Sequence, residues 1–330
     1  MNTKENILGY EKLSKLLKSF AVPSIIAMVV SSLYNVVDQI FIGQGVGYLG
    51  NAATNVSYPL TTICLSIALL IGIGSASRYS LYLGAGEPDK AAKVVGDGIS
   101  MMIFCGIVYA ILIELFIHPM LTAFGATDKV MPYALDYTRI TAVGMPLLIV
   151  TNGISNLARA DGSPKYSMTC MLVGAVINTI LDPIFIFPLG MGVAGAAIAT
   201  VIGQFFSCLM ALRYVPHFQQ VKLNRSHFGL HFRRWPSNVS LGLSSCLNQM
   251  ALTVVQIVLN NSLTYYGAMS VYGKDIPLAA CGIVMKTNSL LLLLSSESLR
   301  DYSPLWDSTT GHANMTVCRK LTGWLSAVTL

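Results

Sequence analysis

Long apolar stretches alternate with short polar segments along most of the chain. A helix needs roughly 20 apolar residues to cross the hydrocarbon core of a bilayer, and eight stretches are close to that length or longer. They lie at residues 20–41, 56–83, 94–117, 131–154, 166–188, 194–214, 238–263 and 278–295. This pattern predicts an all-α polytopic membrane protein with about eight transmembrane helices.

The composition supports this class, and the distribution of charge predicts an orientation. Of the 330 residues, 54% are hydrophobic and 11% are charged, whereas about a quarter of the residues are charged in soluble domains. Basic residues gather in the N-terminal segment and in alternate loops: Lys4, Lys12, Lys15, Lys18, Arg78, Lys90, Lys93, Arg159, Lys165, Arg213, Lys222, Arg225, Arg233 and Arg234. The other loops contain only Lys129 and Lys274. The positive-inside rule therefore predicts a cytoplasmic N-terminus, and the spread of the charge excludes a nucleic-acid partner.

Residues 1–19 are polar and basic, without the apolar core and cleavage site of a removable signal peptide. Leu13, Leu16 and Leu17 give this segment an apolar face, which predicts a cytoplasmic amphipathic segment on the membrane surface. The seven cysteines are scattered singly, so the sequence indicates neither a disulfide framework nor a metal site.

A polar connection at 215–237 divides the chain into two unequal parts. We expect a six-helix bundle at 20–214, a cytoplasmic loop between the bundles, and two helices of an incomplete second bundle at 238–295. The sequence Val-Val-Asp-Gln-Ile at 36–40 resembles Val-Val-Gln-Ile at 254–257, which is typical of duplicated transporter bundles. Asp38 of the first copy corresponds to the neutral Gln256 of the second, so the charged chemistry is predicted to belong to the first bundle.

The tail at 296–330 differs from the rest of the chain. The eighth apolar stretch ends abruptly at Ser295-Ser296-Glu297, and a polar, irregular sequence follows. A reading frame shifted near Ser296 can encode a segment that parallels the end of the second stretch, from Gly72 to Gly96. We interpret residues 296–330 as an aberrant tail produced by a frameshift or by an interrupted gene.

Candidate chemistry is concentrated in the fifth apolar stretch, in the sequence Asn178-Thr-Ile-Leu-Asp182-Pro183. Asn178 and Asp182 are four residues apart and share one face of a helix. A carboxylate inside a membrane is costly unless it meets a partner, an ion or water, so it indicates a functional site. Pro183 frees backbone carbonyls one turn earlier. Amide, carboxylate and carbonyl oxygens together suit a proton or a small hard cation.

Several motifs, in order, resemble the multidrug and toxin extrusion (MATE) transporters, particularly their DinF/MepA-like branch. They are PSIIAMVVSSLYNVVDQIFIG around Asp38, SRYSLYLGAGEPDKA from Ser77, LARADGSPK from Leu157, NTILDPIFIF from Asn178, GLSSCLNQMALTVVQIVLNN from Gly242 and GIVMK from Gly282. The resemblance covers about Leu13 to Ser295. It implies two six-helix bundles around a central cavity, of which this chain contains the first and about a third of the second.

The resemblance also implies a coupling-ion site at Asp38, Asn178, Asp182 and Thr200. Two carboxylates, an amide oxygen and a hydroxyl are hard ligands suited to Na+, and two nearby acids in a low dielectric also favour uptake of a proton. The four residues do not decide between Na+ and H+, and no other cofactor is implied. Met101, Met102, Met145, Tyr34, Tyr137 and Phe205 are candidates for lining a drug cavity, and the alternative is that they face lipid.

The function implied is a Na+- or H+-coupled antiporter that exports organic cations from a bacterial-type cell (inner) membrane, incomplete in this chain. One alternative is a lipid-linked precursor flippase of the same superfamily, although few basic residues besides Arg139 are available to line its cavity. Another is a membrane remnant or partner that inserts without transporting. The sequence contains no HExxH or GxSxG motif, so we do not expect an enzyme.

Overall fold

The computed structural model describes residues 13–229, 234–285 and 287, and its elements are all helical. The long helices are α2 (Leu13–Gly45), α3 (Tyr48–Gly84), α4 (Pro88–Ala123), α5 (Met131–Ala160), α6 (Pro164–Ile186), α7 (Gly192–Tyr214) and α9 (Leu243–Gly267). Short helices are η1 (Val215–His217), η2 (Arg225–His227), α8 (Trp235–Val239) and η3 (Ser240–Gly242). A further apolar helix runs over Asp275–Met285.

The predicted class, an all-α polytopic membrane protein, is confirmed. Within the described residues, six helical stretches are long and apolar enough to cross a membrane: α3, α4, α5, α6, α7 with η1, and α8 through α9. The 33-residue helix α2 covers the first predicted stretch and begins at Leu13, inside the segment expected on the membrane surface. The Asp275–Met285 helix covers the first part of the eighth stretch. The predicted tail at 296–330 lies outside the described residues.

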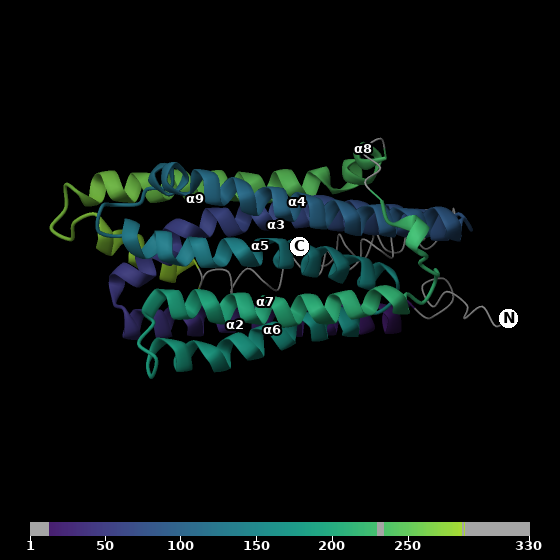
Figure 1. Cartoon of the computed structure of the whole chain (residues 1–330), viewed down its shortest axis with the longest axis horizontal. Coiled ribbons are helices and arrows are strands. Elements are labelled where there is room, and N and C mark those ends of the chain that lie inside the picture. Colours follow the sequence, from purple (N-terminus) through teal and green to yellow (C-terminus); the bar gives the residue numbers. More distant parts are fainter. Residues whose placement is uncertain (1–12, 230–233, 286, 288–330) are drawn as a thin grey trace.

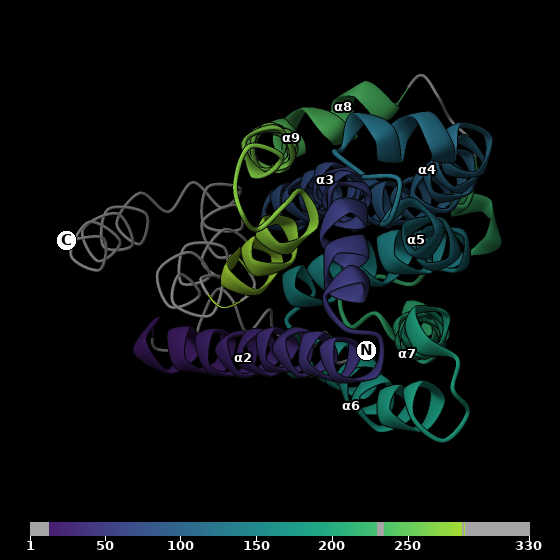
Figure 2. The same cartoon turned by 90° about the vertical axis from the view of Figure 1, so that its left-hand side faces the viewer.

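Helix α3 is central in the bundle and packs against α4, α5 and α9. The other side is a chain of contacts in which α2 packs on α6, α6 on α7, and α7 on α5. Figure 1 shows the long helices running along one common axis, and Figure 2, viewed along that axis, shows α2 and α6 on one side and α4, α8 and α9 on the other. We call the end with the 85–87, 161–163 and 215–229 connections the basic end, because most basic residues of the described connections are near it.

Small residues let α3 approach its neighbours closely. A Cβ on Gly72 would lie 2.9 Å from the Cα of Gly153 on α5, and a Cβ on Gly74 would overlap the carbonyl oxygen of Asn238. Both glycines therefore serve close packing. Gly47 differs: it has φ +84° and no atom within 4 Å of an added Cβ. It permits the turn between α2 and α3, where a positive φ favours glycine.

This geometry predicts different outcomes for two glycine substitutions. Gly72→Ala is expected to lower the free energy of unfolding by about 1–3 kcal/mol, because the new methyl group meets backbone that cannot move aside. Gly144→Ala is the matched control, since its methyl group meets the Gln204 side-chain end, which can rotate away. Thermal unfolding in detergent measures both. Equal melting temperatures for the two variants would contradict the assigned packing.

Candidate functional site

The four candidate ion-site residues lie on three adjacent helices, towards the end of the bundle opposite the basic end. Asp38 is on α2, Asn178 and Asp182 are on α6, and Thr200 is on α7. At a rise of 1.5 Å per residue, they lie between about 6 and 12 Å from the helix ends. The packing of α2 on α6 and of α6 on α7 gives these positions a common neighbourhood.

Asn178 is the centre of the hydrogen bonding in this group. Its Nδ2 donates to Asp182 Oδ1 and to Thr200 Oγ1, both at 3.2 Å. Asp182 is fully buried, and Asn178 is 3% exposed. The Oδ1 atom of Asn178 is buried and accepts no hydrogen bond from the described residues. This amide oxygen is therefore available to a cation, which would satisfy a buried acceptor.

Asp38 and Asp182 lie on α2 and α6, which pack against each other. Tyr34 of α2 and Tyr137 of α5 are near enough to feel the charge of both carboxylates. Asp38 is 7% exposed, so both acids are withdrawn from solvent. Two buried carboxylates beside the same phenols form a region of concentrated negative potential that favours a cation or a proton.

The chemistry of this group fits a hard cation. Carboxylate, amide and hydroxyl oxygens are the ligands that Na+ and related ions prefer. Among the residues that the structure describes, no group of three or more His, Cys, Asp or Glu side chains could hold a metal ion. The oxygens of Asp38, Asn178, Asp182 and Thr200 are of the kind that suit Na+ or H+.

The structure separates the expected cavity-lining residues into two sets. Tyr34 and Tyr137 lie beside the carboxylates, as described above. Met101, Met102 and Met145 do not, because they are buried in the hydrophobic core of the bundle. Phe205 is exposed on the surface of α7. The expectation of a cavity lined by these methionines was wrong, because helix periodicity alone does not distinguish a core face from a cavity face.

Tyr58 of α3 was missed by sequence reasoning. It interacts electrostatically with Tyr34, and 38% of it remains accessible. Its partner residues are on other helices, so only a helical-wheel comparison of α2, α3 and α5 could have suggested it. Tyr34 and Tyr137 are aromatic side chains near both carboxylates, and an aromatic face favours a neighbouring organic cation.

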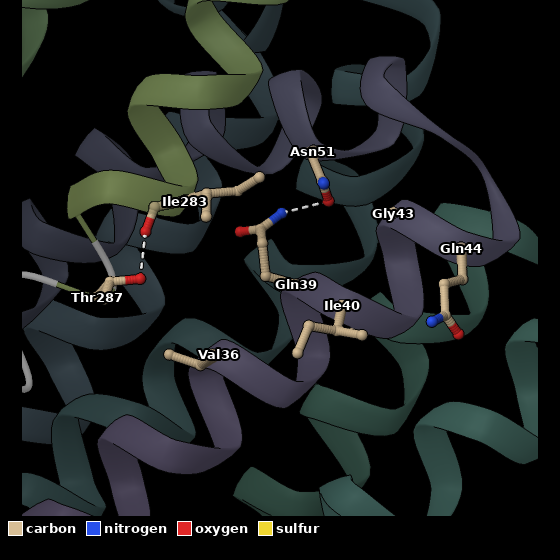
Figure 3. A pocket seen from close by; sticks show the side chains of 8 residues that line it. All are labelled: Val36, Gln39, Ile40, Gly43, Gln44, Asn51, Ile283 and Thr287. Atoms are coloured by element: carbon tan, nitrogen blue, oxygen red, sulfur yellow. Dashed lines mark hydrogen bonds between the residues drawn. The ribbon is translucent and has the colours of Figure 1, made fainter.

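A cavity of about 150 Å³ lies on another face of α2. Figure 3 shows it between α2, α3 and the 275–285 helix, with Ile283 and Thr287 opposite Val36 and Ile40. Gln39 Nε2 donates to Asn51 Oδ1 at 2.5 Å and to Thr54 Oγ1 at 3.1 Å. Because Asp38 and Gln39 are consecutive, α2 carries the ion-site carboxylate on one face and this cavity on another.

Neutral amides join α9 to the first bundle. Gln256 Nε2 donates to Asn55 Oδ1 at 3.2 Å and to Asn260 Oδ1 at 3.1 Å. Asn55 Nδ2 donates to Asn260 Oδ1 at 3.2 Å and to the carbonyl oxygen of Leu278 at 2.9 Å. We call Asn55, Gln256 and Asn260 the amide cluster. Gln256, expected to be the neutral counterpart of Asp38, thus binds other amides between α3 and α9.

Comparisons with known proteins agree with this architecture. The MatE family model matches residues 23–184. The multidrug export protein MepA of Staphylococcus haemolyticus is 27% identical over 278 residues, covering 82% of this chain and 61% of its own. The FAD transporter of Shewanella oneidensis is 26% identical over 304 residues, which cover 87% of this chain and 65% of that protein. The solved MATE multidrug transporter DinF-BH, in complex with rhodamine 6G, is 28% identical with a TM-score of 0.91, covering 99% of this chain and 72% of its own.

The chain covers only part of the length of these relatives. This chain spans 61% of the length of the MepA relative and 65% of the FAD transporter. The activity of a whole transporter is therefore a proposal for this chain.

Proposed function

Because the chain belongs to the MATE family and to its DinF/MepA type, we propose that it supplies the ion-binding bundle of a multidrug efflux antiporter coupled to Na+ or H+. One observation carries the proposal. Inside a multi-pass membrane bundle, Asn178 hydrogen-bonds both the buried Asp182 and Thr200, and the buried Asp38 is on α2, which packs on the same helix α6. The basic end, by the positive-inside rule, faces the cytoplasm of a bacterial-type cell.

The site residues have distinct roles in this proposal. A bound Na+ compensates one of the two negative charges of the carboxylates, and a proton does the same by converting one carboxylate to its neutral form. Asn178 holds the Asp182 and Thr200 side chains in position through its two hydrogen bonds. Loss of negative charge at Asp38 or Asp182 changes the free energy of packing α2 against α6. When the ion favours one packing of these helices over another, its binding is coupled to alternating access.

Organic cations are the proposed substrates. Two buried carboxylates near Tyr34 and Tyr137 attract a flat positive charge and oppose an anion. The MepA relatives and DinF-BH with rhodamine 6G agree with this class. The FAD transporter relative indicates another substrate for the same family, but a dinucleotide carries negative phosphates that the carboxylates would repel.

An efflux experiment tests the proposal. Cells expressing this chain, or a version with the reading frame restored after Ser295, are loaded with rhodamine 6G and energised by a Na+ or a proton gradient. We expect gradient-dependent export of the dye from the restored version and weak or no export from the 330-residue chain. Retention of the dye by both, with normal membrane insertion, would contradict the antiporter. Export of FAD instead of the dye would favour the other substrate.

A further inference from the structure

The connection between the bundles is held against the first bundle at both of its ends. Its described parts are residues 215–229 and 234–242, which we call the linker. The linker begins directly after α7 and ends where η3 passes into α9. In Figure 1 it lies at the same end of the molecule as the 85–87 and 161–163 connections.

The start of the linker is held by Asp161, which follows α5 and is 1% exposed. Its Oδ1 accepts hydrogen bonds from Tyr79 Oη at 2.5 Å and from the backbone N–H of Gln220 at 3.2 Å. Its Oδ2 accepts from Tyr214 Oη at 2.6 Å and from the backbone N–H of Gln219 at 2.7 Å. One carboxylate thus joins α3, α5, α7 and the linker.

The ionised carboxylate is the form that these four donors favour. Burial raises the pKa of the Asp161 carboxyl, and the hydrogen bonds from Tyr214, Tyr79, Gln219 and Gln220 oppose that shift. Phe218 strengthens the attachment, because its ring packs on the rings of Tyr79 and Tyr214 at centroid distances of 5.9 and 5.1 Å. Charge-assisted hydrogen bonds and buried aromatic contacts therefore act on the same few residues.

The end of the linker is held by charge and by backbone contact. Arg234 Nη1 lies 3.5 Å from Oδ2 of the buried Asp97 on α4, and Arg78 Nη1 donates to Ser237 Oγ. The backbones then meet directly. A Cβ on Gly242 would overlap the carbonyl oxygen of Leu70 and lie 3.0 Å from the Gly74 nitrogen.

We infer that the linker is a fixed part of the first bundle, held by Asp161 at its start and by the Gly74–Gly242 contact at its end. Helix α9 therefore starts from a fixed position on α3. Side-chain contacts hold α9 further along, among them the amide cluster and the 2.9 Å bond from Thr253 to Thr62. The attachment of the linker does not depend on the proposed transport.

Limited trypsin digestion of the full 330-residue chain in detergent tests the attachment. In Asp161→Asn, an NH2 group replaces one of the two carboxylate oxygens. If it replaces Oδ2, the N–H of Gln219 loses its acceptor, and if it replaces Oδ1, the N–H of Gln220 does. We expect cleavage after the exposed Lys222 to become about tenfold faster, because the opened state becomes more populated. Tyr214→Phe removes one donor and leaves both linker N–H groups bonded, so it is expected to have a smaller effect.

Cleavage after Lys129, at the opposite end of the bundle, is the control for folding and should not change. Equal cleavage after Lys222 in the wild type and Asp161→Asn would overturn the role of Asp161. Faster cleavage of Asp161→Asn at both sites identifies general unfolding, and the result for Tyr214→Phe then decides. Faster cleavage of Tyr214→Phe after Lys222 alone supports the attachment. Unchanged cleavage of Tyr214→Phe overturns it.

Discussion

Asp182→Asn is expected to weaken Na+ binding at least a hundredfold and to abolish ion-coupled export of rhodamine 6G by the frame-restored protein. The substituted amide keeps the size of the side chain but removes a fully buried negative charge. Removing one partner from a buried charge interaction costs about 3–5 kcal/mol, and about 3 kcal/mol corresponds to more than a hundredfold in affinity. Isothermal titration with NaCl in detergent measures the affinity, and dye export measures the coupling.

Asp136→Asn provides the matched control for this experiment. It makes the same chemical change on α5, towards the same end of the bundle, but on an exposed side chain. Its Na+ affinity and dye export should equal those of the wild type. Undiminished, gradient-dependent export by Asp182→Asn would remove this residue from the coupling site, and an equal loss in both variants would show that the effect is not specific to Asp182.

The second large effect is expected from the amide cluster. Asn55→Ala removes three hydrogen bonds at once: those to Asn260 and Leu278, and the one accepted from Gln256. At about 0.5–1.5 kcal/mol each, their loss should lower the free energy of unfolding by about 2–4 kcal/mol. Thermal unfolding in detergent, followed by intrinsic fluorescence, should show a melting temperature lower by several degrees.

Asn261→Ala tests whether burial is the reason. Asn261 is on α9 next to the cluster and donates to the carbonyl oxygens of Ala123 and Ile257, but it is exposed. Water can replace its hydrogen bonds, so a loss below about 1 kcal/mol is expected. If Asn261→Ala destabilises the protein as much as Asn55→Ala does, the buried cluster is not what holds α9 to α3.

The sequence was sufficient to predict the helical class, because runs of about 20 apolar residues have few other structural outcomes. It also placed Asn178 and Asp182 on one face of a helix, since a spacing of four residues determines that. Thr200 followed from the family resemblance and not from spacing. The structure puts it within hydrogen-bonding distance of Asn178, and its role in ion binding stays a prediction.

Contacts between distant segments could not be read from the sequence. Asn55 and Gln256 lie far apart in the chain, and each alone is an ordinary polar residue in a helix. Asp161, in the Leu157–Lys165 motif, carried the same ambiguity: a loop acid is usually solvated, whereas this one is buried by Tyr79, Tyr214 and the linker. Burial of a polar side chain depends on which helices become neighbours, and local patterns do not specify that.

The amide cluster also determines how the seam between α3 and α9 responds to acidity. Asn and Gln side chains do not titrate, so the adhesion of these two helices keeps the same strength across the physiological pH range, from about 5 to 8. A designer could therefore substitute Asp38 or Asp182, the acids of the proposed coupling site, without changing the hydrogen bonds of this seam.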